Sequence, residues 1–322
     1  MPRWSCERFE PVKQALIVLL AVLLAACSGG RASRDTVVVI PSGSSLTAAA
    51  RLLEKEDAIA TADGFLRYAK LFGSSDPIKP GEYKIKKGMD SGEVLELLQS
   101  GKIFQRFIIV PPGMPSIMVH ERLMAATHLA GDVAVPAEGS ILPDSYAYTK
   151  GEKRSAVVAR MQAAMAKTLA TLWSERKPTT VARTPEEAII LAAIVEKETA
   201  KPEERRTVAG VYSNRVRLGM KLQADPTVIY PVTKGKPLGR RILRSELDAD
   251  NGYNTYARAG LPVGPIANPG KASIAAVLDP EPTRFIFFVA DGSGGHVFAE
   301  TLAQHDANVG KWFALRKAKG EM

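Results

Sequence analysis

The segment AIILAAIVEKET, residues 188–199, runs eight consecutive apolar residues directly into two glutamates. Before it stands TPEE, residues 184–187, which offers a capping side chain, a proline suited to the first helical turn and a glutamate three residues after the cap. The pattern predicts a helix from about Pro185 to about Thr199. A helix that is apolar on every side packs inside a protein, so a glutamate near its end is partly desolvated and holds its proton more tightly than in water. Such a carboxyl suits general acid catalysis near neutral pH.

The two glutamates of this segment, Glu196 and Glu198, cannot both face one cleft. Residues two positions apart lie roughly 200° apart around a helix axis. We therefore expect one to serve as the acid and the other to face something else. The plainer alternative is that both carboxylates solvate the helix end and pair with basic neighbours. The basic residues available for such pairs are Lys197, Lys201, Arg205 and Arg206.

The composition is that of a globular protein with one large or two modest domains, because the chain has 322 residues of which 46% are hydrophobic. Its formal net charge of +9 favours anionic surroundings such as nucleic acid, a lipid surface or an acidic polymer. Aromatic residues make up only 7% of the chain, and no familiar nucleic-acid-binding motif occurs in it. Together with the secretory leader described next, these features exclude nucleic acid as an expected partner.

The N-terminus, residues 1–27, has the three parts of a secretory signal. Basic residues precede a 12-residue apolar run, residues 15–26, which is short for a membrane span of about 20 residues. The run ends in LAAC, which resembles the lipobox of bacterial lipoproteins and makes Cys27 the expected site of lipid attachment. The alternatives are an uncleaved membrane anchor and a soluble secreted form. All three place the body of the protein outside the cytoplasm.

Cysteine and histidine residues give no sign of a metal site or a cofactor. The two cysteines are Cys6 and Cys27, so no disulfide framework is expected after cleavage. The histidines at positions 120, 128, 296 and 305 are scattered and lack the spacing of zinc ligands. We therefore expect neither a metal nor a cofactor.

The first part of the chain, residues 36–110, predicts a small domain in the order strand, helix, helix, strand. The second part, residues 111–320, predicts a larger domain of helices, short strands and long Gly- and Pro-rich loops. The expected fold class is α+β, with a small β-α-α-β domain followed by a mixed α/β domain. Strands are expected at residues 36–40, 103–110, 285–290 and 296–299, and residues 80–88 are expected to form a turn followed by a strand. Helices are expected after a cap at Ser44 or Ser45 and at residues 62–71, 91–99, 117–126, 154–173, 185–199 and 204–218.

Several long motifs in this sequence resemble those of the YceG-like family of endolytic murein transglycosylases. They are IVEKET at 194–199, VYSNRVRLGMKLQADPTVIY at 211–230, YNTY at 253–256, GLPVGPIANPG at 260–270 and FFVADGSGGHVF at 287–298. The resemblance extends from about residue 36 to 315. It implies that residues 36–110 form a peptidoglycan-binding unit similar to a LysM domain and that residues 111–320 form the catalytic domain.

The resemblance also implies an activity and a location. Members of the family cleave the glycan between N-acetylmuramic acid and N-acetylglucosamine within the strand, leave a 1,6-anhydro end and terminate growing strands. The expected partners are therefore peptidoglycan strands, the membrane and peptidoglycan synthases. Anchoring in the inner membrane, facing the periplasm, is expected, and an outer-membrane lipoprotein is the alternative.

The family motif assigns the acid to Glu198, and Glu198 with Thr199 is similar to the Glu-Ser pair of other lytic transglycosylases. One carboxyl can suffice, because the acid that protonates the glycosidic oxygen can then accept the proton of the muramic 6-hydroxyl. A hydrolase would use two carboxylates. The candidates for a second carboxylate are Glu138, Asp144 and Asp225.

The remaining site residues are expected to bind substrate. Gln223 and Asp225 could bond sugar hydroxyl or acetamido groups, although an Asp before Pro is equally a turn former. Tyr253, Asn254 and Tyr256 could provide a stacking face and an amide contact, with aromatic packing in a loop as the alternative. The set is completed by Glu138, Glu196 and Thr199, while Asn268 is interpreted as a helix cap.

The sequence departs from the family pattern in two places. Within the motif at residues 138–146, residues 140–142 stand where relatives usually carry aromatics, which removes an expected stacking role there. The lipobox at Cys27 differs from the uncleaved membrane helix of relatives. Two other functions remain open: a muramidase of the same fold, which would release reducing ends, and a non-catalytic lipoprotein that binds wall glycan and recruits synthesis enzymes.

Overall fold

The structure is a computed structural model that describes residues 31–320. The predicted leader at residues 1–27, with Cys27, lies outside the described residues. Within residues 31–320 no helix is long and apolar enough to cross a bilayer. The chain divides into two compact units between Arg106 and Phe107.

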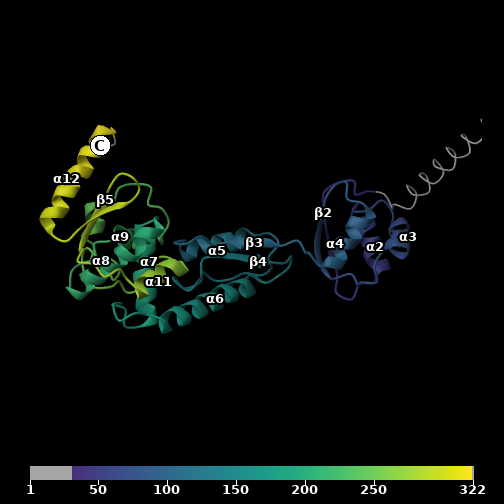
Figure 1. Ribbon diagram of the computed structural model, residues 1–322, viewed down its shortest axis with the longest axis horizontal. Helices are drawn as coiled ribbons and strands as arrows, with labels where there is room; N and C mark the ends of the chain where they lie inside the picture. Colours follow the sequence, from purple (N-terminus) through teal and green to yellow (C-terminus); the bar gives the residue numbers. More distant parts are fainter. Residues whose placement is uncertain (1–30, 321–322) are drawn as a thin grey trace, which may run out of the picture. The chain divides into compact units, whose positions relative to one another are not determined.

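The first unit packs three helices against a two-stranded sheet (Figure 1). Strands β1 and β2 are antiparallel, with Thr36 opposite Ile85 and Ile40 opposite Gly81. Each of its helices begins at a side-chain cap, and the hydrophobic core centres on Phe65. The predicted order of strand, helix, helix, strand is therefore present, followed by a third helix. The elements are β1 (Thr36–Ile40), α2 (Leu46–Lys55), α3 (Ala62–Phe72), β2 (Gly81–Ile85) and α4 (Ser91–Ser100).

The second unit is mainly helical, with two-stranded sheets formed by β3 with β4 and by β5 with β6. Helix α12 contacts both β5 and β6 (Figure 1). The elements are β3 (Arg106–Ile109), α5 (Ser116–Ala125), β4 (Ser145–Tyr148), α6 (Arg154–Ser174), α7 (Pro185–Glu198), a 3-10 turn (Pro202–Glu204), α8 (Arg205–Arg217), α9 (Asp225–Thr233), α10 (Arg244–Leu247), α11 (Lys271–Leu278), β5 (Phe287–Ala290), β6 (His296–Ala299) and α12 (Leu302–Ala318).

Helix α7 is the centre of this unit, as the apolar run predicts. The Thr184 side chain caps it by accepting a hydrogen bond from the Glu187 amide, and Pro185 occupies its first turn. All of its residues from 188 to 195 except Ile190 are buried. Helices α8 and α11 pack against it and share its hydrophobic core. The predicted buried helix is confirmed, and it ends at Glu198.

The mixed α+β class is confirmed, with sheets of two strands. The strand predicted at 103–110 is shorter, since only Arg106–Ile109 is extended in a sheet. Helices α9, α10, α11 and α12 and strand β4 are not predicted by the sequence patterns. Helix α11 follows the Gly- and Pro-rich loop directly, and its apolar sequence has no polar stripe. Helix α12 has no buried residue, so it lacks the periodic apolar face by which a helix is recognised.

Candidate active site

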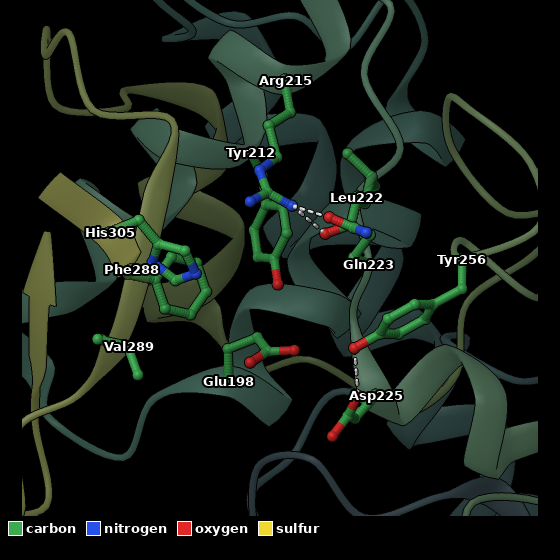
Figure 2. Close-up of a pocket in the computed structure, with 10 residues that line it drawn as sticks. All are labelled: Glu198, Tyr212, Arg215, Leu222, Gln223, Asp225, Tyr256, Phe288, Val289 and His305. Carbon is green, nitrogen blue, oxygen red and sulfur yellow. Dashed lines mark hydrogen bonds between the residues drawn. The ribbon is translucent and has the colours of Figure 1, made fainter. Parts of the chain in front are cut away.

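A cavity of about 440 Å³ opens at the end of α7 (Figure 2). Its lining combines carboxylates with hydroxyl, amide and guanidinium groups. The lining residues come from α7, α8, the start of α9, β5, α12 and two loops, one before α9 and one that contains Tyr256. This arrangement gathers residues more than 100 positions apart in the sequence. The lining residues are Glu198, Tyr212, Arg215, Leu222, Gln223, Asp225, Tyr256, Phe288, Val289 and His305.

Glu198 is the last residue of α7, and its carboxyl lies in this cavity. Its Oε1 atom is buried and has no hydrogen-bond partner among residues 31–320. The pKa of this carboxyl is raised from its ordinary value of 4.5 to about 7, mainly by burial and also by the charge of Asp225. The Tyr212 hydroxyl and the Arg215 charge act in the opposite direction and lower that pKa, but burial is the largest effect. Glu198 can therefore give up or take a proton near neutral pH.

Tyr212 and Arg215 lie three residues apart on α8, so both reach the same face of that helix. Figure 2 shows the Tyr212 hydroxyl pointing toward the Glu198 carboxyl. The Arg215 side chain is held by carbonyl oxygens, since its Nε donates to Ile286 over 2.7 Å and its Nη1 to Leu222 over 2.8 Å. Burial lowers the pKa of Arg215 and raises that of Tyr212. A fixed positive charge and a protonated hydroxyl therefore face the acid.

Gln223, Asp225 and Tyr256 form another side of the cavity. Gln223 has a left-handed backbone, with φ of 54°, and its amide donates to the Thr255 carbonyl over 3.1 Å. Its Oε1 accepts a hydrogen bond of 3.4 Å from Arg215 Nη1. The Tyr256 hydroxyl donates to Oδ1 of Asp225 over 2.6 Å. Of the three candidates for a second carboxylate, Asp225 lines the cavity, whereas Glu138 and Asp144 do not.

Glu196 and Thr199 lie outside the cavity lining. The Glu196 side chain is only 6% exposed, and its Oε2 accepts a hydrogen bond of 2.8 Å from the Gly270 amide. Its Oε1 is 3.8 Å from a guanidinium nitrogen of Arg205. The prediction that the two glutamates of α7 face different surroundings is therefore confirmed. Thr199 is buried, and its hydroxyl donates to Oε2 of Glu204 over 3.1 Å.

Glu138 and Asn268 belong to a buried polar cluster away from the cavity. Oε1 of Glu138 accepts hydrogen bonds from the Ser116 amide at 2.9 Å and the Ser116 hydroxyl at 3.1 Å. Burial raises the pKa of Glu138. Asn268 bonds to the Ile141 amide and the Met114 carbonyl. The interpretation of Asn268 as a cap is wrong, because α11 begins after Gly270.

Tyr253 and Asn254 also point away from the cavity lining. The Tyr253 ring packs on Tyr230 with centroids 4.8 Å apart. Asn254 is 1% exposed, and its amide nitrogen donates to three backbone carbonyls of residues 246–249. Its Oδ1 accepts a bond from the Tyr256 amide. Asn254 therefore shapes the loop that presents Tyr256.

Six lining residues were not predicted as site residues. Three of them, Tyr212, Arg215 and Leu222, fall within the motif at 211–230. Membership of that motif is the only feature of the sequence that points to them as site residues. Phe288 and Val289 fall within the motif at 287–298, and their apolar character predicts a buried strand. His305 follows no recognisable pattern. Within residues 31–320, no group of three or more His, Cys, Asp or Glu side chains is placed to hold a metal ion.

Comparison with known sequences identifies the class of protein. The profile of the YceG-like family matches residues 38–311, which is most of the chain. The chain therefore belongs to the YceG-like family. It is similar to the endolytic murein transglycosylase of Bacillus subtilis (strain 168), with 29% identity across 89% of this chain and 88% of the relative.

Two further comparisons agree with this membership. The endolytic murein transglycosylase of Streptococcus pneumoniae serotype 2 is 27% identical over 84% of this chain, which spans 57% of that longer relative. A crystal structure of a Listeria monocytogenes protein described as yceG-like superposes with a TM-score of 0.55 at 24% identity, covering 85% of this chain and 98% of that one. At this identity the second likeness shows a shared fold.

Proposed function

We propose that this chain is an endolytic lytic transglycosylase of peptidoglycan, with Glu198 as its catalytic acid and base. Membership of the YceG-like family supports the reaction class. The observation that carries the assignment is the burial of the Glu198 carboxyl in an open polar cavity, which raises its pKa to about 7. A carboxyl with this pKa is suited to donate a proton and later accept one at neutral pH.

The reaction cleaves the bond between N-acetylmuramic acid and N-acetylglucosamine within a strand. Protonated Glu198 gives its proton to the glycosidic oxygen as the bond to C1 breaks, and N-acetylglucosamine leaves with a free 4-hydroxyl. The carboxylate then accepts the proton of the muramic 6-hydroxyl as that oxygen bonds to C1. The product is a 1,6-anhydro end, no water is consumed, and Glu198 returns to its protonated form.

The other polar residues of the cavity support these steps. Arg215 stabilises the carboxylate that forms after the first proton transfer, and the negative charge of Asp225 stabilises positive charge on the sugar at C1. Gln223 and Tyr256 are proposed to bind the sugar. The muramidase alternative uses the same cavity with Asp225 as the second carboxylate, and it would release reducing ends.

Mass analysis of the products tests this proposal. The purified protein acts on intact sacculi beside Glu198→Gln, which keeps the size of the side chain and removes the transferable proton. Anhydro ends that disappear with Glu198→Gln are expected. Reducing ends from the unaltered protein would establish the muramidase alternative, and undiminished anhydro ends with Glu198→Gln would disprove the role of Glu198. Binding without products would favour the non-catalytic scaffold.

We also propose that the enzyme terminates nascent strands in the cell envelope, together with peptidoglycan synthases. The first unit, with its β1-α2-α3-β2 order, is proposed to be a LysM-like domain that binds the glycan. Cys27 is proposed to carry the lipid, with the inner membrane as the location. Replacing Cys27 with Ala tests the lipid: a mature protein of unchanged mass and membrane association would show that Cys27 is not modified.

A further inference from the structure

The β5–β6 hairpin supplies Phe288 and Val289 to the Glu198 cavity, and the Glu204 carboxylate is one of the groups that attach it to the rest of the unit. Glu204 lies at the end of the 3-10 turn that precedes α8. Its Oε1 accepts a hydrogen bond of 2.9 Å from the His296 amide, and its Oε2 lies 2.8 Å from His296 Nδ1. The same Oε2 accepts the Thr199 hydroxyl at 3.1 Å. Glu204 thus joins the hairpin to the residue that follows Glu198.

A chain of ring contacts leads from this carboxylate back to the acid. The His296 ring meets Phe288 edge to face, with centroids 5.0 Å apart. Phe288 in turn meets Tyr212 edge to face at 5.7 Å. The Tyr212 hydroxyl lowers the pKa of Glu198, which places the two groups in direct interaction. Ring pairs favour this edge-to-face geometry, so His296 and Phe288 support the position of Tyr212.

The hairpin turn fits closely over Glu204. A Cβ atom at Gly295 would lie 2.4 Å from Oε1 of Glu204 and 2.5 Å from Nζ of Lys201. Lys201 also donates to the Ser293 hydroxyl over 3.1 Å. The Glu204 side chain is only 13% exposed. Burial acts to raise its pKa, but the hydrogen bonds with His296 and Thr199 together outweigh burial and lower that pKa. The attachment is therefore formed by a charged group with little access to water.

We propose that Glu204 is a positioning residue of the Glu198 cavity, which holds the hairpin wall against α8 and so keeps the acid desolvated. Glu204 does not line the cavity, so it acts through His296, Phe288 and Tyr212. This inference rests on the proposed role of Glu198 as the acid. Without the attachment, water enters beside Phe288, and the pKa of Glu198 falls toward its ordinary value.

Charged and titratable groups lie around both the Glu198 and the Glu204 carboxyls, and the variants below leave these groups unchanged except where one of them is itself replaced. Lys201 and His296 lie beside Glu204, Asp291 interacts with Lys201, and none of these three residues lines the cavity. Glu198 is faced by groups from α8, α9, the 253–256 loop and α12. These groups are Tyr212, Arg215, Asp225, Tyr256 and His305.

The test compares Glu204→Gln with Glu203→Gln in the full chain. Glu203 is the exposed neighbour on the same turn and serves as the matched control. Carbon-13 NMR of labelled glutamate carboxyls gives the pKa of Glu198, assigned through Glu198→Gln. We expect Glu204→Gln to lower the pKa of Glu198 by about one unit or more, and Glu203→Gln to leave it unchanged.

Kinetics on soluble glycan strands complete the test. Glu204→Gln is expected to lower kcat by about 10- to 100-fold with little change in KM, because the acid is misplaced while the binding groups remain. If Glu204→Gln fails to fold, His296→Phe provides the second variant, since it keeps the ring against Phe288 and removes the pairing nitrogen. It is expected to shift the pKa of Glu198 in the same direction.

Either variant with an unchanged Glu198 pKa and only a lowered melting temperature would overturn the positioning role. The NMR measurement does not require activity. If Glu204→Gln shifts the pKa of Glu198 but the unaltered protein releases no anhydro ends, the proposed function is disproved, while the effect of Glu204 on the Glu198 cavity stands.

Discussion

The Tyr256 hydroxyl donates a hydrogen bond of 2.6 Å to Oδ1 of Asp225 at the rim of the Glu198 cavity. Tyr256 comes from a loop and Asp225 begins α9, so this bond joins two segments 31 residues apart. The charge of Asp225 raises the pKa of Glu198. The pair therefore fixes a negative charge where it favours the protonated form of the acid.

Replacing Asp225 with Asn should lower the pKa of Glu198 below 7, because it removes this charge while an oxygen that can accept the Tyr256 bond remains. A general acid works only while it is protonated, so the alkaline limb of the pH–rate profile should move to lower pH. Asp132→Asn, at an exposed position of the same unit, is the control. An alkaline limb that stays in place would contradict the electrostatic role of Asp225.

Glu198→Gln should stabilise the protein at alkaline pH and not at acid pH. Burial raises the pKa of Glu198 to about 7 from 4.5, so the folded state binds this proton more tightly than the unfolded state. The stability that the proton provides is fully present below pH 4.5 and is lost as the pH rises through 7. Urea unfolding should show Glu198→Gln more stable by about 1–3 kcal/mol above neutral pH, with the difference vanishing in acid. An equal difference at both pH values would contradict a raised pKa of Glu198 in the folded state.

Gln223→Gly should lower activity without lowering stability. Gln223 has φ of 54°, where a side chain is strained and glycine is not. Release of this strain and the greater flexibility of the unfolded chain nearly cancel, so stability should change by less than about 1 kcal/mol. Activity should fall about tenfold with loss of the amide contact to the sugar. Full activity in Gln223→Gly would show that the side chain is not used in binding.

Asn254→Ala should act mainly on stability. The buried Asn254 amide donates to three carbonyls within residues 246–249, and alanine would remove all three hydrogen bonds and leave the Glu246 and Leu247 carbonyls without this partner. Chemical unfolding should show a loss of about 2–4 kcal/mol. The KM of the folded fraction should change little, since Asn254 does not line the cavity. A large rise in KM with unchanged stability would instead place Asn254 in contact with the glycan.

The sequence predicts α7 and the position of its two glutamates because the signals for this helix are all local. The helix is indicated by adjacent positions: a cap at Thr184, a proline at 185 and the apolar run to 195. These signals predict a helix without reference to the rest of the chain. Helical geometry then separated Glu196 from Glu198. The structure adds which of the two lies in the cavity. Glu196 instead accepts a hydrogen bond from the Gly270 amide, which is more than 70 positions away in the sequence.

The rest of the site depends on contacts that no local pattern reveals. Tyr253 and Asn254 have the chemistry of sugar-binding residues, but their side chains face Tyr230 and the backbone of residues 246–249. His305 reaches the cavity from α12, a helix with no buried residue and hence no apolar period. Residue type therefore predicts which chemistry is available, whereas long-range packing decides which residues meet.

The end of α7 at Glu198 has an electrostatic consequence of its own. The carbonyls of the last turn of a helix are unpaired within it, and they give that end a partial negative charge of about half a unit. An ionised carboxylate is disfavoured there by about 0.3–1 kcal/mol. Since Glu198 is the last residue of α7, the backbone itself opposes loss of its proton. Extending α7 by one turn would move the negative end of the helix dipole beyond Glu198. Glu198 would then bind its proton less tightly.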